Sequence, residues 1–320
     1  MINRQETLRL LTPTATDFVE VAILERDGIV ESRHRGIAAL TGPDGKLIDH
    51  LGSSKRIIYP RSAVKPLQAV AMRRAGLRLS GAELAICCGS HQGTDAHLEL
   101  VNGILAGVGL TTDALQCPPS WPGNPAARAN ASGESREAFN CSGKHAGFLA
   151  ASVAAGWDTA NYLNAEHPIQ GLVRDVLEEF SGEPILHSTV DGCGAPLHTI
   201  TVEGLARAFG KFAAEETDIA EAMLAHPWAV GDVGSVDAIV MAEGLVAKLG
   251  AEGVFAVGTP DGHGVAVKIA DGSLRAAPLV AVQLLHKNGL ITDASFARLN
   301  QKLAVKSMGG SVELGRLEAI

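Results

Sequence analysis

Strand-forming runs occupy the first part of the chain, between Phe18 and Leu51. The run Val19–Leu24 is rich in β-branched and aliphatic residues, as is typical of a strand. The pairs Asp27-Gly28 and Asp44-Gly45 separate such runs, and both dipeptides favour the tight turns of antiparallel hairpins. The pattern therefore predicts an antiparallel meander at this end of the chain.

The periodicity becomes helical after Ser62 and remains so to about Leu249, with loops rich in Gly, Pro and Asn between the helical segments. Helices are predicted near residues 62–76, 80–87, 94–107, 145–155, 160–180, 197–213 and 217–227.

Strands are predicted again at residues 253–258 and 264–269, on either side of the turn-forming segment 259–262. A helix follows from about Ala276, and residues 307–320 are expected to be loosely ordered or to pack on a partner. The pattern predicts an α/β (α+β) fold in which residues 1–320 form a single catalytic unit. Its sheet layer comes from about 15–60 and 250–320, with a helical region at about 61–249.

Composition narrows the function classes. A hydrophobic fraction of 46% with 36 glycines and 4% aromatic residues is typical of an enzyme with close small-residue packing. The net charge of −8 argues against a nucleic-acid or anionic-membrane partner. The start of the chain lacks the apolar core of a signal peptide, so a cytoplasmic location is expected. Five cysteines, an odd number, then favour thiols or metal ligands over a disulfide framework.

The first candidate for catalysis is the segment Arg61-Ser62-Ala63-Val64-Lys65-Pro66 at a predicted helix start. Positions i and i+3 share one helix face, so Lys65 is expected to reach the Ser62 hydroxyl. A lysine whose pKa is lowered by burial or by a second cation can act as the base that activates a serine. The alternative is a helix-capping serine beside a surface lysine.

Three further segments are dense in reactive side chains and glycines: Ser90-His91-Gln92-Gly93, residues 140–147 (Asn-Cys-Ser-Gly-Lys-His-Ala-Gly) and residues 190–196 (Val-Asp-Gly-Cys-Gly-Ala-Pro). Together with residues 61–66, and in the same order from about Val19 to Leu285, these blocks resemble the Rhizobium-type L-asparaginase family. The resemblance implies a serine β-lactamase/penicillin-binding-protein-like fold, a homodimer, and hydrolysis of the side-chain amide of L-asparagine to L-aspartate and ammonia. Hydrolysis of glutamine or a β-aspartyl compound is an alternative, as is a non-catalytic protein that binds zinc or an amino acid.

The resemblance also implies roles for individual residues. Ser62 would be the nucleophile and Lys65 its base, with Ser90 as a proton relay, although the two serines could exchange roles. Lys268, on a predicted strand, would be the second cation that lowers the pKa of Lys65. Simpler readings are a turn serine at Ser90 and a solvated lysine at Lys268.

Two other sets of residues match the family. Cys141, Lys144 and Cys193 match its zinc ligands, although Cys-x-x-Lys is a poor zinc signature on general grounds because an amine must lose its proton to coordinate a metal. The positions that match its substrate contacts are Arg61, His145 and Asp191; a carboxylate suits an α-ammonium group and a guanidinium suits an α-carboxylate. Local salt bridges would explain these charged residues equally well.

Several motifs of other enzyme classes are broken. The residues after Lys268 are Ile269-Ala270 instead of Thr-Gly, and Ser-Asp-Asn is absent, which argues against β-lactam chemistry. Ser142-Gly143-Lys144 lacks the first glycine and the final Ser or Thr of a P-loop. A redox Cys-x-x-Cys is also absent.

Overall fold

The computed structural model describes residues 4–320, and within these residues eight strands form one antiparallel sheet. Its order is β11-β12-β1-β2-β10-β9-β8, with β3 paired to β2. The strands are β1 (Val19–Arg26), β2 (Ile29–Thr41), β3 (Leu47–Leu51), β8 (Val246–Gly250), β9 (Val254–Gly258), β10 (Gly264–Ile269), β11 (Lys306–Gly309) and β12 (Val312–Ala319). The mixed α/β class with an antiparallel sheet is therefore confirmed.

The predicted hairpin turns are present. Asp27 and Gly28 join β1 to β2 with φ angles of 49° and 77°, the left-handed conformation that an Asp-Gly pair adopts in a tight hairpin. Gly45, with φ of 75°, serves the turn between β2 and β3, and Gly262, with φ of 93°, the turn between β9 and β10.

Helices fill the chain between β4 (Ile57–Ile58) and β8. They are α2 (Lys65–Arg74), α3 (Gly81–Cys87), α4 (Asp95–Gly107), α5 (Pro125–Asn130), α6 (Ser142–Ala155), α7 (Pro168–Ser181), α8 (Val202–Glu215), α9 (Thr217–Ala225), α10 (Pro227–Val230) and α11 (Val236–Met241), with 3₁₀ turns η1 (Arg61–Val64) and η2 (Thr112–Ala114). Three short strands interrupt them: β5 (Ser188–Val190), β6 (Pro196–His198) and β7 (Ile200–Thr201). Outside this region lie α1 (Arg4–Leu11), α12 (Ala277–Lys287) and α13 (Asp293–Leu303).

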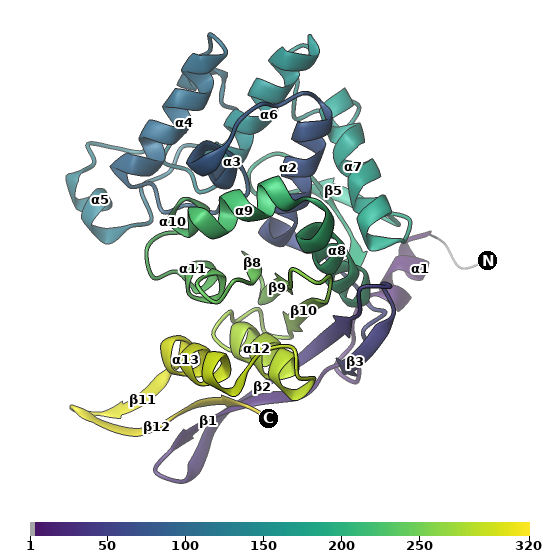
Figure 1. Ribbon diagram of the computed structural model, residues 1–320, viewed down its shortest axis with the longest axis vertical. Helices are drawn as coiled ribbons and strands as arrows, with labels where there is room; N and C mark the ends of the chain where they lie inside the picture. Colours follow the sequence, from purple (N-terminus) through teal and green to yellow (C-terminus); the bar gives the residue numbers. More distant parts are fainter. Residues whose placement is uncertain (1–3) are drawn as a thin grey trace.

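Glycines allow α8 to pack directly on the sheet. A Cβ atom on Gly264 of β10 would lie 1.8 Å from the Ala206 carbonyl oxygen of α8, and one on Gly258 of β9 would lie 2.4 Å from that of Phe209. Phe209 and Phe212 of the same helix are fully buried. Helices α12 and α13 lie on the side of β8–β10 that faces away from α2–α7 (Figure 1). The central strands β2, β9 and β10 are thus enclosed between two helical layers, with α8 on one face and α12 on the other.

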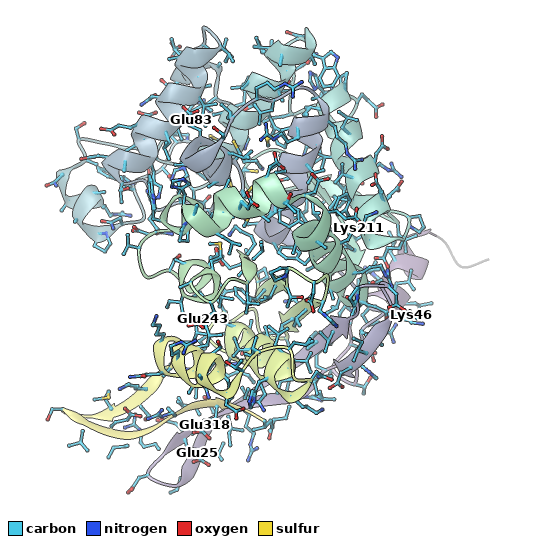
Figure 2. The ribbon with its side chains drawn as sticks, in the orientation of Figure 1. Glu25, Lys46, Glu83, Lys211, Glu243 and Glu318 are labelled. Atoms are coloured by element: carbon cyan, nitrogen blue, oxygen red, sulfur yellow. The ribbon has the colours of Figure 1, made fainter. Side chains whose placement is uncertain are left out.

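Several predicted element boundaries are wrong. The helix predicted from residue 160 begins at Pro168, after the His167 cap, and the helix predicted from residue 197 begins at Val202, because residues 196–201 pair as short strands. The segment 307–320 is not loose: β12 pairs with β1, with Ala319 opposite Ala22. Figure 2 shows the consequence, since Glu25 and Glu318 lie close together at the edge of the molecule far from the helical region.

Ion pairs lie on the surface around this core. Glu243, labelled in Figure 2, accepts two hydrogen bonds from the Arg298 guanidinium of α13, at 2.8 and 2.6 Å.

Within residues 4–320, no helix is long and apolar enough to cross a membrane.

Candidate active site

Ser62 lies in the 3₁₀ turn η1, which leads directly into α2. Arg61, just before it, has a left-handed backbone with φ of 52°, and Lys65 N donates to Ser62 O to close the turn. The turn rests on β8: a Cβ on Gly250 would lie 2.4 Å from the Pro60 carbonyl oxygen. Close contact between the edge strand and the turn therefore requires glycine at position 250.

Lys65 is the centre of the buried polar groups beside this turn. It is 2% exposed, and its Nζ donates to Ser90 Oγ at 3.0 Å, to Asn140 O at 3.4 Å and to Gly89 O. Burial lowers the pKa of Lys65; the Cys141 sulfur opposes the shift, and the ammonium groups of Lys248 and Lys144 add to it. Within residues 4–320 the Ser62 hydroxyl makes no hydrogen bond, so the direct serine partner of Lys65 is Ser90.

The Ser90 loop is held by contacts to two other elements. Ser90 N donates to Val230 O at 2.6 Å, and a Cβ on Gly89 would lie 2.8 Å from Ala229 O. His91 Nδ1 accepts from Gly93 N at 3.1 Å, so the other ring nitrogen, Nε2, carries the proton and donates to Ser142 Oγ at 2.8 Å. His91 thus joins the Ser90 loop to the start of α6.

The second cation of the site is Lys248, not Lys268. Lys268 Nζ donates to the carbonyl oxygens of Ile269, at 2.8 Å, and of Glu252, and the charges that act on it are those of Glu252 and Asp271. Lys248 lies on the edge strand β8 and is fully buried, with Nζ 3.0 Å from Asp237 Oδ2 and 3.0 Å from Leu249 O. The expectation that Lys268 lies beside Lys65 was wrong because residues 246–250 form a strand where helical periodicity was inferred.

Cys141 and Cys193 bring two buried sulfurs to the same place. Lys144 Nζ lies 3.0 Å from Cys193 Sγ, and Cys141 Sγ lies 3.2 Å from Asn140 Oδ1. Contact with Cys193 and the nearby ammonium groups of Lys65 and Lys144 lower the pKa of Cys141 well below its usual range, while the same contact and burial raise that of Cys193. All five cysteines are free and buried.

The two sulfurs and the Lys144 amine form a donor set that fits a three-ligand zinc site. Burial acts to lower the pKa of Lys144, but the Cys193 and Cys141 sulfurs raise it overall, so the amine would have to lose its proton to coordinate a metal. In the described part of the chain no three His, Cys, Asp or Glu side chains gather as a metal site, so a metal here would need the lysine.

The three residues predicted to contact substrate separate into two places. Arg61 and Asp191 form an ion pair, Nε to Oδ1 at 2.8 Å, and both are partly exposed. His145 is fully buried on α6, where Nδ1 bonds the Tyr162 hydroxyl at 2.7 Å and the ring interacts with the Cys193 thiol. Burial lowers the pKa of His145 to about 4, so this ring is neutral near pH 7.

One narrow pocket brings together five of the ten predicted site residues: Arg61, Ser62, Lys65, Lys144 and Asp191. It is lined by Arg61, Ser62, Val64, Lys65, Gln68, Lys144, Leu177, Asp191, Pro196, Leu197 and His198. The wall thus combines the candidate nucleophile and its lysine with the Arg61–Asp191 ion pair. Ser90 and Cys193 do not line the pocket; they hydrogen-bond the amines of Lys65 and Lys144, which do.

Comparison with known proteins identifies the family. The family model described as L-asparaginase II matches residues 22–319. The chain belongs to the L-asparaginase II family. This is a family of amidohydrolases, and the match confirms the asparaginase resemblance.

The solved structures found by comparison are more distant. The native form of Mglu matches with a TM-score of 0.45 and 15% identity, covering 81% of this chain and 66% of that one. The glutamate form of Mglu matches with a TM-score of 0.42 and 14% identity, covering 80% of this chain and 61% of that one. The chain therefore spans less than two thirds of the length of these structures. No curated protein matches the chain significantly.

Three site residues of this L-asparaginase II family member were not predicted from the sequence: Lys248, Gln68 and His198. Lys248 follows the strand-forming run Leu245-Val246-Ala247 and precedes Leu249-Gly250, a Lys-x-Gly pattern that could have indicated it. Gln68 lies one turn after Lys65 and so shares its helix face. His198 follows the 190–196 block by two residues, and no local pattern separates it from an ordinary strand histidine.

Proposed function

We propose that the protein is an L-asparaginase that hydrolyses the side-chain amide of L-asparagine to L-aspartate and ammonia. The observation that carries this proposal is the placement of Lys65. Its buried amine bonds Ser90 Oγ at 3.0 Å and lines the same pocket as the unpaired Ser62 hydroxyl. A lysine whose pKa is lowered by burial suits proton transfer to and from a serine.

The reaction would proceed in two stages. Ser62 Oγ attacks the carboxamide carbon, and its proton passes to the Lys65 amine, with Ser90 as the relay. The carbon–nitrogen bond then breaks as Lys65 returns that proton, through Ser90, to the leaving nitrogen, which departs as ammonia. Water attacks the resulting ester, Oγ regains a proton, and aspartate is released. Ser62 is preferred as nucleophile because it lines the pocket and is partly exposed, whereas Ser90 is buried behind it.

The charged ends of the amino acid have matching groups in the pocket wall. The Arg61 guanidinium suits the α-carboxylate and the Asp191 carboxylate suits the α-ammonium group. In the structure these side chains pair with each other at 2.8 Å, and the zwitterionic substrate would exchange that ion pair for two of its own.

Zinc is part of the proposal as a bound cofactor. Cys141, Lys144 and Cys193 would hold it, with one position open to water or substrate. Bound there, the metal would supply positive charge that orients polar groups of the substrate. The antiparallel sheet enclosed by two helical layers also agrees with a serine β-lactamase-like fold, and a homodimer is proposed from the family resemblance.

The test is ammonia release from asparagine and glutamine by the wild type and by Ser62→Ala, Ser90→Ala and Lys65→Met, with bound metal quantified on each sample. Release selective for asparagine should disappear in Ser62→Ala and Lys65→Met at unchanged metal content. Ser152→Ala, which removes a buried hydroxyl that bonds Phe148 O on α6, is the matched control and should retain activity. Faster ammonia release from glutamine than from asparagine would identify glutamine as the substrate instead. A wild type that holds metal and releases no ammonia would favour a binding protein.

A further inference from the structure

Two neutral polar side chains in the pocket wall have no role in the chemistry above. Gln68 is 5% exposed, and its side chain makes no hydrogen bond within residues 4–320. His198 is 7% exposed; its Nδ1 bonds Ser188 Oγ at 2.7 Å, and its Nε2 is buried without a partner. A buried polar atom without a partner costs free energy, so the His198 Nε2 atom, in the same pocket wall as a glutamine amide with no hydrogen bond among the described residues, indicates a site for a polar ligand.

Both groups are uncharged near neutral pH. Burial lowers the pKa of His198 to about 4, with the Arg174 charge acting in the same direction, and a glutamine side chain does not titrate. The charged groups of this wall already have partners, since Arg61 binds Asp191, Lys65 binds Ser90 and Lys144 binds Cys193. The remaining polar surface therefore suits a neutral group better than an ion.

We propose that Gln68 and His198 form a neutral subsite that binds the carboxamide of the substrate beside Ser62 and favours this amide over the carboxylate of the product. A carboxamide has a donor and an acceptor, and it can pair with a glutamine side chain and an imidazole together. A carboxylate has acceptors only, so in the same place it would leave the Gln68 oxygen facing another oxygen. This inference rests on the proposed asparaginase function and adds the residues that distinguish substrate from product.

The location of the two side chains supports the assignment. Gln68 lies on α2 three residues after Lys65, so both face the same side of the helix. His198 ends β6, the strand that pairs with Val190 immediately before Asp191. The subsite is therefore built from the helix that carries the candidate base and from the β5–β6 hairpin, whose turn carries Asp191, the candidate ligand for the α-ammonium group.

The test uses Ser62→Ala, which removes turnover, and measures binding of asparagine and of aspartate by calorimetry. In this background Gln68→Met and His198→Asn should each raise the Kd for asparagine about tenfold. The Kd for aspartate should change much less, so the preference for the amide should fall.

His198→Gln is the rescue variant, because a glutamine amide reaches the position of Nε2 whereas an asparagine amide reaches only that of Nδ1. It should restore most of the affinity for asparagine. Gln283→Met, a similar change in α12, is the control and should leave both Kd values unaltered. Equal weakening of asparagine and aspartate binding, or unchanged preference in both variants, would overturn the subsite while leaving the proposed activity intact. Absence of asparagine hydrolysis by the wild type would instead reject the proposed function.

Discussion

The buried ion pair between Lys248 and Asp237 allows a quantitative test of how the site is supported. Both side chains are fully buried, and Asp237 accepts from Lys248 Nζ at 3.0 Å and from Leu249 N at 2.8 Å. The change Asp237→Asn keeps the side-chain oxygen that binds Leu249 N and removes the negative charge. Lys248 then retains only Leu249 O, at 3.0 Å, as a partner for a buried ammonium group.

Loss of one partner of a buried ion pair is expected to lower the free energy of unfolding by about 3–5 kcal/mol, because the remaining charge stays out of water. Lys248→Met alone should cost a similar amount, since it leaves Asp237 unpaired. The double variant Asp237→Asn/Lys248→Met has no uncompensated charge, and methionine fills much of the volume of the lysine chain. It should therefore recover at least half of the loss caused by Asp237→Asn.

The assay is urea unfolding followed by tryptophan fluorescence, with ammonia release measured on the same samples. The double variant should be folded and yet release ammonia at least about tenfold more slowly than the wild type, because burial still lowers the pKa of Lys65 but the Lys248 ammonium that adds to this shift is gone. Additive losses of stability in the double variant would refute the ion-pair reasoning. Full activity in the folded double variant would refute the role of Lys248 beside Lys65.

Three further changes have defined outcomes. Because burial lowers the pKa of His198 to about 4 from 6.5, the unfolded chain takes up that proton first as the pH falls. The stability this histidine contributes is therefore complete above pH 6.5 and is lost toward pH 4. Denaturation at pH 7 and at pH 4.5 measures the free energy of unfolding, and its decrease between the two should be about 2–3 kcal/mol larger in the wild type than in His198→Gln. Gly250→Ala, whose Cβ would lie 2.4 Å from Pro60 O, should lower both kcat and the unfolding temperature, whereas Gly171→Ala on α7, with open space around its Cβ, should lower neither. If zinc binds at Cys141, a chelator should lower the unfolding temperature of the wild type and added zinc should restore it, with no response in Cys141→Ser; identical responses would exclude this site.

Local chemistry allowed part of this fold to be predicted from sequence. The Asp27-Gly28 turn depends on two neighbouring residues that favour positive φ, so it can be recognised without knowledge of the rest of the chain. The strand β12 could not be recognised in this way. Its sequence, Val-Glu-Leu-Gly-Arg-Leu-Glu-Ala, has few buried positions, and it is a strand because β1, nearly 300 residues earlier, offers it an edge. Non-local pairing of this kind leaves little trace in a local pattern.

The candidate site shows the same division between local and non-local information. The spacing of Ser62 and Lys65 is local, and the structure places both in one pocket wall, but the serine that bonds Lys65 belongs to a loop 25 residues later. The error at Lys268 has a similar cause. A lysine on a strand near the chain end satisfied the expectation of a second cation, yet β10 lies two places inward from the sheet edge. The edge strand β8 packs closely against the turn that carries Ser62, because Gly250 lets it approach Pro60. Besides Lys144 of α6, the cation beside Lys65 comes from this edge strand, and the order of strands in the sheet, more than the type of residue, determines that it is Lys248.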